Sequence, residues 1–495
     1  MRPLSVAIPA AFVAGLLMIT CMAGMVSAEP GTDALEGITL EQGAADDFDG
    51  GEFVAINLSD GTAPAWFGVV YGTEDSPAPI TLVGIYIRYL GGAEIRDESG
   101  GMMIPAVPIP VVTVFAQSLF ALVEFNDTGY PFLGERVGAD NGVFDFLGHR
   151  SINSFIPVSF EPIYKMVDLR TAWNLSEIED VTDEANNSKR FDFSLSAQNL
   201  TYDKIWDDKP AENLDGSRTG TEEDGVVEKV EFRFHVEAVL EDITTDVPWY
   251  RVTMDDGNNI IASEEVESKT YTGTHISASF KYDHIIDGWD YTSQSDTSKL
   301  MLENFLFFGT FIPDIVQDWI DAQFIDEVDE GSGVVEYETE DGEMSAETNE
   351  DLPEESTRIA DNKIVFRDNW ERCGLLTWVS NVTVDGEEKD MYYQIHAGTA
   401  DEMRGDNNDG NVKAIAILGG YIYPAGENIY HDPVFEANSI MLDIGPDFQP
   451  LIFLLMIGAV IACVVPIGAV MVLRRKTKRM DERFAYQFPP EYRRK

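Results

Sequence analysis

Cysteine is scarce in this chain, with three among 495 residues. Cys21 and Cys463 lie in apolar segments near the two ends, which leaves Cys373 alone in the long region between them. No disulfide can therefore form within that region, although extracellular eukaryotic domains of this size often contain several. The cysteine content favours a prokaryotic protein over a eukaryotic ectodomain.

Basic residues are also few, since 34 Lys and Arg stand against 87 Asp and Glu, and the formal net charge is −53. The region between the two apolar ends is more acidic still, because Arg2 and a basic C-terminal tail lie outside it. Such a surface repels nucleic acid and anionic lipid headgroups, and it attracts cations or basic partners. Nucleic acid is therefore excluded as a partner, although the acidity serves equally well to keep a surface hydrated.

Motifs of common hydrolases and nucleotide-binding proteins are absent. The chain has no G-x-S-x-G, no G-x-x-x-x-G-K-[ST], no H-E-x-x-H and no paired C-x-x-C. Asp127-Thr128-Gly129 matches the tripeptide of aspartic peptidases, but those enzymes need a second such carboxylate and no second tripeptide occurs. We expect a protein that is not an enzyme, with an extracytoplasmic hydrolase of unidentified carboxylates as the alternative.

The first 28 residues have the features of a secretory signal peptide. Arg2 precedes a long apolar run that ends in the small residues Val26-Ser27-Ala28. This pattern predicts cleavage after Ala28. An uncleaved N-terminal anchor is the alternative, since the apolar run is somewhat long.

Residues 451–473, LIFLLMIGAVIACVVPIGAVMVL, form an uncharged run long enough to cross a bilayer as one transmembrane helix. The segment 474–495 that follows contains nine basic and three acidic residues. Lys and Arg concentrate on the cytoplasmic side of a span. We therefore expect a single-pass protein of the cell membrane, with a cytoplasmic tail at 474–495 and an extracellular N-terminal region.

A second uncharged stretch, GMMIPAVPIPVVTVFAQSLFALV at 101–123, is predicted to be a buried strand or strand pair. A span there would place the basic tail on the outer side, against the charge rule. Pro105, Pro108 and Pro110 leave only 111–123 for an unbroken helix, which is too short to cross a bilayer.

The exterior region is predicted to be mainly β, folded as antiparallel β-sandwich-like domains. Residues 29–50 have the composition of a flexible leader, 51–185 of an N-terminal β-rich domain and 186–446 of a second one. Apolar and polar residues alternate most clearly in KVEFRFHVEAVL, 229–240. Hairpin turns are expected at Asp256-Gly257 and at Asp385-Gly386.

Two segments of the second domain depart from this alternation. Dense apolar residues over 298–328 predict a short helical insertion divided by Pro313. From Asp326 to Glu355, fourteen of thirty residues are acidic and none is basic. We therefore expect 326–356 to be an acidic disordered insertion.

Two acidic loops are weak candidates for calcium binding. The loop Asp140-Asn-Gly-Val-Phe-Asp145 has the glycine and trailing aspartate of a calcium loop, and Asp406-Asn-Asn-Asp-Gly offers the oxygens of Asp406, Asn408 and Asp409. Hard oxygens suit Ca²⁺, but both spacings depart from the twelve-residue calcium loop and either loop could be a plain turn. No other cofactor is identified.

A third cluster, YDHIIDGWDY at 282–291, places His284 beside Asp283, Asp287 and Asp290. Histidine with carboxylates can bind a transition metal. A strand end around a structural Trp289 is the simpler interpretation, and it is the one we favour.

Six N-glycosylation sequons occur in the exterior region, at Asn57, Asn126, Asn174, Asn186, Asn199 and Asn381. With the signal peptide, the single span and the lack of disulfides, this layout resembles that of anchored archaeal surface glycoproteins. The resemblance concerns architecture and implies no site residue.

The sequence as a whole predicts a membrane-anchored extracellular surface protein with a structural, adhesive or binding role, which Ca²⁺ could assist. Its expected partners are the membrane, and itself or other surface proteins. Besides the hydrolase, an accessory or sensor subunit of a membrane complex is an alternative.

Overall fold

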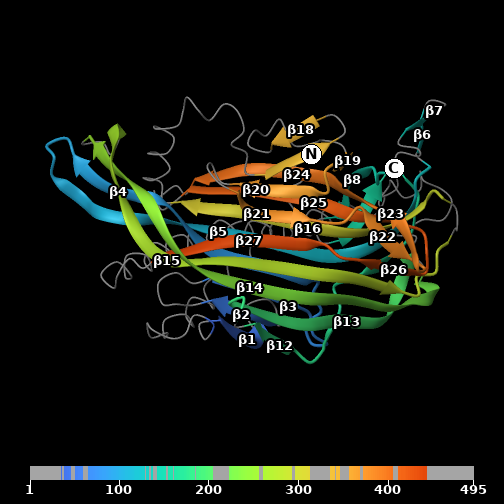
Figure 1. Ribbon diagram of the computed structural model, residues 1–495. Coiled ribbons are helices and arrows are strands. Elements are labelled where there is room, and N and C mark those ends of the chain that lie inside the picture. The colour runs from blue at the N-terminus through green and yellow to red at the C-terminus, as the bar shows by residue number, and fades with distance from the viewer. Residues whose placement is uncertain are drawn as a thin grey trace, which may run out of the picture.

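The computed structural model describes residues 35, 38–45, 51–58, 65–128, 130–132, 135–137, 142–151, 154–159, 161–183, 185–204, 222–255, 260–292, 296–312, 335–339, 342–345, 356–367, 372–404 and 411–442. These residues contain 27 strands and no α-helix (Figure 1). The prediction of a mainly β, antiparallel chain is therefore confirmed. Residues 451–473 lie outside the described part, and within that part no helix has the length and apolar character needed to cross a bilayer.

The first layer has the N-terminal strands at one edge. Strands from later in the chain form its other edge. Each strand pairs antiparallel with the next in the order given. The strands are β1 (Ile38–Ala45), β2 (Gly51–Leu58), β3 (Ala65–Tyr71), β4 (Ile80–Asp97), β5 (Met102–Asn126), β16 (Ser298–Ile312), β25 (Asn411–Pro424), β24 (Tyr392–Arg404) and β19 (Thr357–Arg358).

A second layer is built from the middle and the C-terminal part of the chain, again with antiparallel neighbours. Its strands are β12 (Glu179–Asp183), β13 (Ser188–Lys204), β14 (Glu222–Met254), β15 (Ile260–Asp287), β27 (Val434–Leu442), β21 (Arg372–Thr377), β20 (Lys363–Arg367), β17 (Val335–Thr339) and β18 (Gly342–Ser345).

The remaining strands extend or link these layers. β26 pairs with β15 and with β22, which forms a hairpin with β23, while β11 pairs with β13 and β10 pairs with both β5 and β13. Two further hairpins are β6–β7 and β8–β9. Their bounds are β6 (Tyr130–Phe132), β7 (Glu135–Val137), β8 (Phe146–Ser151), β9 (Ser154–Ser159), β10 (Ile163–Asp168), β11 (Asn174–Leu175), β22 (Asn381–Val384), β23 (Glu387–Asp390) and β26 (Asn428–His431).

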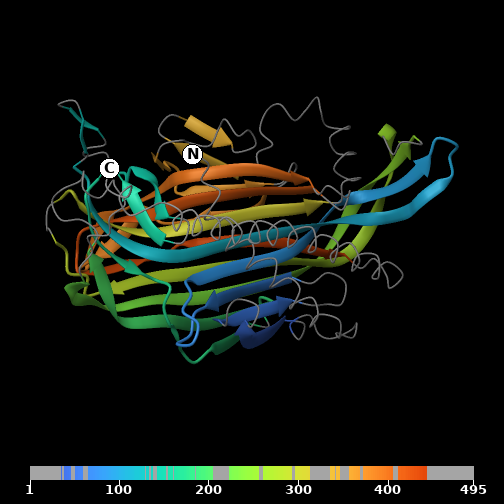
Figure 2. The same ribbon diagram turned by 180° about the vertical axis from the view of Figure 1, so that it is seen from behind.

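The two layers lie face to face (Figures 1 and 2), and aromatic side chains pack between them. The ring of Phe115 on β5 stacks on Phe435 of β27 with centroids 3.5 Å apart. Phe67 on β3 meets Phe280 of β15 at 5.6 Å. Burial of aromatic side chains is among the largest stabilising contributions in a core. These contacts place the apolar core between the layers.

Strands pair with each other across the domain boundary predicted at residue 185. β5, which precedes it, pairs with β16, which follows it, and β10 pairs with β13. Strands from both sides thus share one hydrogen-bonded sheet and one apolar core. The division into 51–185 and 186–446 as folding units stays a prediction.

The strand predicted for 101–123 is confirmed as part of β5. Val114, Phe115, Leu122 and Val123 are fully buried within it. The alternation seen in 229–240 is also confirmed in β14, where Phe232 and Phe234 point into the core and the residues between them point outward.

Both expected hairpins are present. β14 and β15 pair up to Met254 and Ile260, although the turn residues 256–259 are outside the described part. At the second turn, Asp385 and Gly386 have φ angles of 53° and 83°, and β22 and β23 pair on either side of it. Two successive positive φ angles are typical of a type I′ turn, which matches the twist of a hairpin.

The helix predicted for 298–328 is wrong over its first half, because Ser298–Ile312 form strand β16. This strand lies between β5 and β25, and residues 300–309 are all buried. A strand covered on both faces is apolar at successive positions, and periodicity cannot distinguish it from a buried helix. Residues 313–328 lie outside the described part.

The disorder predicted for 326–356 is wrong for Val335–Thr339 and Gly342–Ser345, which form β17 and β18. Val335 and Tyr337 are buried, whereas the acidic residues alternate with them. Arg367 of β20 donates a hydrogen bond to Glu336. These contacts, with the backbone pairing of β17 to β20, attach the acidic pair of strands to the second layer. The rest of 326–356, apart from Ser356, lies outside the described part.

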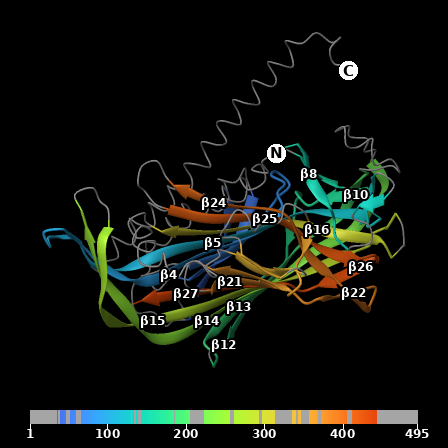
Figure 3. The same cartoon turned by 90° about the horizontal axis from the view of Figure 1, so that it is seen from above.

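Four strands extend beyond the layers as a projecting arm, which Figures 1 and 3 show beside the labels β4 and β15. We define the arm as residues 91–97 of β4, 102–111 of β5, 245–254 of β14 and 260–270 of β15. Within it β14 runs parallel to β4, the one parallel pairing among the described strands. The indole of Trp249 covers Gly92, where an added Cβ would lie 2.5 Å from the ring. The backbone pairings and this contact therefore hold the arm together as a four-stranded ribbon.

Candidate functional sites

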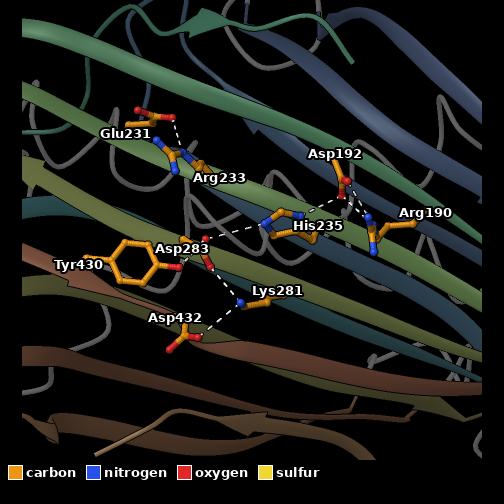
Figure 4. A network of polar contacts seen from close by, with 9 residues as sticks. All are labelled: Arg190, Asp192, Glu231, Arg233, His235, Lys281, Asp283, Tyr430 and Asp432. Carbon is orange, nitrogen blue, oxygen red and sulfur yellow. Dashed lines mark hydrogen bonds and ion pairs between the residues drawn. The ribbon is translucent and has the colours of Figure 1, made fainter. Parts of the chain in front are cut away.

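Charged side chains of both signs gather on the outer face of the second layer (Figure 4). We call this the mixed-charge face and define it as Arg190, Asp192, Glu231, Arg233, His235, Lys281, Asp283, Tyr430 and Asp432. They come from β13, β14, β15 and β26 with the residue after it. Each lies at an outward position, since its neighbours along the strand are buried: Phe191 and Phe193, Phe232 and Phe234, Tyr282 and His284, and Ile429 and His431.

His235 lies at the centre of this face, between two carboxylates. Its Nδ1 is 2.9 Å from Asp192 Oδ1, and its Nε2 is 3.7 Å from Asp283 Oδ2. Asp283 also accepts a hydrogen bond of 2.9 Å from the Tyr430 hydroxyl and pairs with Lys281 at 3.4 Å. Although it is on the outer face, Asp283 is only 5% exposed, because these neighbours cover it.

Ion pairs continue along the strands on either side of His235. Arg190 pairs with Asp192 at 3.0 Å, and Arg233 donates a hydrogen bond of 2.7 Å to Glu231. Burial alone would raise the pKa of Glu231, but hydrogen bonds from Arg233 and Lys229 outweigh it and lower that pKa below its usual value. Burial and the hydrogen bond to Asp283 raise the pKa of Tyr430 to about 12, so its hydroxyl stays protonated as a donor.

The balance of charge on the mixed-charge face differs from that of the chain as a whole. The face holds four acidic and three basic side chains with one histidine, whereas the chain as a whole has 87 acidic and 34 basic residues. Each isolated surface ion pair adds little stability. Together they hold side chains of both signs in fixed positions, which lowers the entropy lost when a polar partner binds.

A second group of polar side chains is buried between the layers. The Tyr282 hydroxyl contacts Gln117 and Tyr421, and the Tyr423 hydroxyl lies 2.7 Å from His284 Nδ1 and 3.3 Å from His431 Nδ1. Burial raises the pKa of Tyr282 and Tyr423 and lowers that of both histidines. All these groups are therefore neutral at pH 7, and they form two hydrogen-bonded groups between the layers, one around Tyr282 and one around Tyr423.

A buried ion pair lies near the C-terminal end of β5. Lys165 of β10 lies 3.7 Å from Glu124, donates a hydrogen bond to the carbonyl of Asp290 and sits 4.2 Å from the centroid of the Tyr202 ring. Glu124 also accepts hydrogen bonds from Trp289 and from the backbone N–H of Thr292. Trp289 is fully buried, in accord with its predicted structural role.

The fully buried Glu161 lies beside the half-buried Asp145. Glu161 is fully buried and accepts hydrogen bonds from the Ser159 hydroxyl and from the backbone N–H of Asp145. Burial, and then the nearby Asp145 carboxylate, raise the pKa of Glu161 to about 9. Glu161 is thus protonated at neutral pH, and a neutral Glu161 is not repelled by the neighbouring Asp145 carboxylate.

Of the calcium candidates, Asp145 is described and lies beside Glu161. Asp140, Asp406, Asn408 and Asp409 lie outside the described residues. Within the described residues no group of three or more His, Cys, Asp or Glu side chains is arranged to hold a metal ion. His284 and Asp283 do not form the metal cluster considered above, because successive residues of β15 point to opposite faces: His284 is in the core and Asp283 is in the mixed-charge face.

The six sequons differ in exposure. Asn57 is buried on β2 and donates a hydrogen bond to Glu41, and Asn126 is half-buried and donates one to the Tyr164 hydroxyl. Four asparagines are exposed, namely Asn174, Asn186, Asn199 and Asn381. The four exposed ones are the positions at which a glycan can be accommodated without displacing a core contact.

The mixed-charge face and the buried hydrogen-bonded groups were not identified from the sequence. One signal was available: His284 is in phase with Phe280 and Tyr282 along β15, which places it inward. Lys281 and Asp283 are in the opposite phase, which places them outward. The partners across neighbouring strands depend on pairings that alternation does not specify.

No protein-family model matches the chain, and no curated protein is significantly similar to it.

Proposed function

We propose that this chain is a membrane-anchored extracellular surface protein with an adhesive or structural role. In this proposal residues 451–473 cross the membrane, 474–495 lie in the cytoplasm, and the two antiparallel layers form a sandwich-like body outside the cell. The exposed Asn174, Asn186, Asn199 and Asn381 would carry its glycans. Nucleic acid is not among its partners, since a chain with a net charge of −53 repels it.

The observation that carries the adhesive role is the mixed-charge face. On a molecule this acidic, two copies repel each other over most of their surfaces. Around His235 both signs are present in comparable number and are held in ion pairs. A neighbouring surface protein or a second copy can therefore approach there with opposite charges facing each other. Charge complementarity of this kind sets the specificity and the on-rate of association.

Calcium assistance belongs to the same proposal. Residues 405–410 and the segment around Asp145 contain carboxylates, and divalent cations would reduce the repulsion between acidic copies. The contribution of Ca²⁺ can be separated from that of the mixed-charge face. Screening by Ca²⁺ acts over the whole acidic surface, whereas a substitution on the mixed-charge face changes particular residues only.

The test is sedimentation velocity of the detergent-solubilised chain, once with millimolar Ca²⁺ and once with chelator. Arg233→Glu leaves five acidic and two basic side chains on the face, and Lys363→Glu makes the same charge change on β20 as a matched control. We expect Ca²⁺-dependent association that Arg233→Glu abolishes and Lys363→Glu preserves. Equal association of both variants would contradict a role for this face, and a monomer in every condition would contradict self-association.

The alternative of an extracytoplasmic hydrolase is favoured by one observation, the Asp145–Glu161 pair. Two neighbouring carboxyls, one with a pKa raised to about 9, could act as acid and base. Glu161 is fully buried, however, so a substrate would reach it only after the segment around Asp145 moved. Hydrolysis of any glycoside or peptide substrate that Glu161→Gln abolishes would favour this alternative.

A further inference from the structure

His235 on the mixed-charge face is held in the orientation of a metal ligand (Figure 4). Its Nδ1 lies 2.9 Å from Asp192 Oδ1, and because a carboxylate only accepts, this nitrogen carries the ring proton. The lone pair of Nε2 in the neutral ring then faces Asp283. A carboxylate that orients a histidine through one nitrogen, while the other nitrogen binds the metal, is a common arrangement at zinc sites.

The space between His235 and Asp283 suits a metal ion. His235 Nε2 and Asp283 Oδ2 are 3.7 Å apart, which is too far for a direct hydrogen bond. Both atoms are acceptors, so a proton or a metal ion between them is needed to make the contact favourable. Zinc binds imidazole nitrogen and carboxylate oxygen at about 2.0–2.2 Å, so two such atoms at a tetrahedral angle lie about 3.4 Å apart. Only a small movement of the two side chains would bring both into contact with the ion.

Asp283 has a free oxygen position for an ion although it is almost fully buried. Its Oδ2 accepts one hydrogen bond, from the Tyr430 hydroxyl, and its Oδ1 accepts none among the described residues. Lys281 lies 3.4 Å from Oδ1 as an ion pair, but it lies equally close to Asp432 and can turn to that carboxylate. The His235 side chain is 35% exposed, so an ion can reach this pair from solvent.

One chain supplies only part of the ligands that zinc requires. Structural zinc is almost always four-coordinate and tetrahedral. Among the described residues, no group of three or more His, Cys, Asp or Glu side chains is arranged to hold a metal, so His235 and Asp283 need ligands from elsewhere. In a contact about a two-fold axis the same patch meets itself. A second copy would therefore bring its own His235 and Asp283 to the ion and complete the tetrahedron.

The charges around His235 and Asp283 suit such a contact. Arg190 on β13 and Asp432 after β26 lie on opposite sides of this pair, which comes from β14 and β15 (Figure 4). Their side chains are 42% and 32% exposed. A two-fold axis along the strands reverses the strand order in the second copy, so that Arg190 of each copy faces Asp432 of the other. Opposite charges would then flank the ion on both sides.

We propose that His235 and Asp283 form half of a Zn²⁺ site, and that two copies of the chain share one ion across their mixed-charge faces. This inference rests on the proposed self-association through that face, and it names the ion and the residues that join the copies. It is distinct from the calcium contribution, because Ca²⁺ takes oxygen ligands and has no use for an imidazole.

The experiment uses the detergent-solubilised full chain, stripped of metal with chelator and then dialysed. Titration calorimetry with Zn²⁺ gives the affinity and the stoichiometry, and sedimentation velocity is run with Zn²⁺, with Ca²⁺ and with chelator. His235→Gln and Asp283→Asn each remove one ligand. His275→Gln is the matched control, since His275 also lies on β15 or its neighbours' sheet and is 3.8 Å from the exposed Glu241. If Asp283→Asn does not fold, His235→Gln at its partly exposed position still tests the site.

We expect one Zn²⁺ bound per two chains and a dimer in Zn²⁺. His235→Gln and Asp283→Asn should each bind Zn²⁺ at least about tenfold more weakly and stay monomeric in it, while His275→Gln behaves like the unmodified chain. One Zn²⁺ per chain without a dimer, or equal binding by all the variants, would overturn the shared site.

The remaining outcomes separate this inference from the proposed function. Association in Ca²⁺ that Arg233→Glu abolishes, together with no response to Zn²⁺, would overturn the zinc site alone. A monomer in every condition would overturn the zinc site and the proposed self-association together.

Discussion

His284 and Tyr423 are joined by a 2.7 Å hydrogen bond in the core between the two layers, where neither residue is accessible to solvent. His431 Nε2 lies 3.2 Å from the carbonyl oxygen of Val379 and donates to it, so its Nδ1 is an acceptor for the Tyr423 hydroxyl. Tyr423 in turn accepts from His284 Nδ1. One hydroxyl thus bonds to one ring nitrogen of each of two neutral imidazoles.

Tyr423→Phe should destabilise the fold through this arrangement. The substitution removes the oxygen between the two histidines and leaves a donor on His284 and an acceptor on His431 buried and unpaired, at a cost of about 2–4 kcal/mol. Urea unfolding followed by tryptophan fluorescence measures the loss. Tyr392→Phe, which keeps the ring beneath the Arg358 guanidinium, is the control. Equal effects of the two changes would contradict the bridging role.

Acid should destabilise the protein through His431. Burial lowers its pKa from 6.5 to about 4. Between these values the unfolded chain binds a proton that the folded chain does not, so this contribution to stability is present above pH 6.5 and is lost as the pH falls to 4. The full effect is about 3 kcal/mol. The groups facing His431 are Tyr421, Tyr423 and His284, with Asp283 behind them.

His431→Gln removes this titration, so its unfolding free energy should fall less steeply between pH 6.5 and 4 than that of the unmodified protein. Asn381→Ala, an exposed change that removes no titrating group, is the control and should keep the original slope. Parallel curves for all three proteins would show that the acid sensitivity arises elsewhere, for example in the carboxylates.

Sequence patterns predicted the local structure of the layers better than their assembly. The alternation in β14 and the Asp385-Gly386 turn are local, since each depends on a few neighbouring residues. β16 was misassigned because both its faces are buried by β5 and β25, which are distant in sequence. The Asp145–Glu161 and Asp192–His235 pairs likewise arise from packing between separate segments. A single sequence carries no direct signal for those contacts.

Glu161→Gln should stabilise the protein increasingly as the pH rises. The pKa of Glu161 is about 9 in the folded chain and near its ordinary 4.5 when unfolded. Between these values the folded chain holds a proton that the unfolded chain has lost, so stability falls as the pH rises through this range. Glutamine donates a hydrogen bond without titrating, and at pH 8 the gain should be about 2–4 kcal/mol. Asn174→Ala, an exposed change that removes no titrating group, should give no such trend in thermal unfolding.

Gly92→Val should loosen the arm without unfolding the body. A side chain at Gly92 would meet the Trp249 indole, since even its Cβ would lie 2.5 Å from the ring, and the parallel pairing of β14 with β4 would have to open. Proteases cleave the locally opened state, and the population of that state falls about tenfold for each 1.4 kcal/mol of opening free energy. A cost of about 1.4 kcal/mol should make tryptic cleavage after Lys269 roughly tenfold faster.

The control for this change is Thr253→Ala, also on β14 and half-buried, which leaves the Trp249 contact intact. Mass spectrometry of the tryptic fragments gives the cleavage rate after Lys269 for each protein, and cleavage sites in the body report whether the layers stay folded. Unchanged cleavage after Lys269 in Gly92→Val would mean that the contact between Trp249 and Gly92 does not hold the arm together. Faster cleavage everywhere would mean instead that the arm and the layers unfold as one unit.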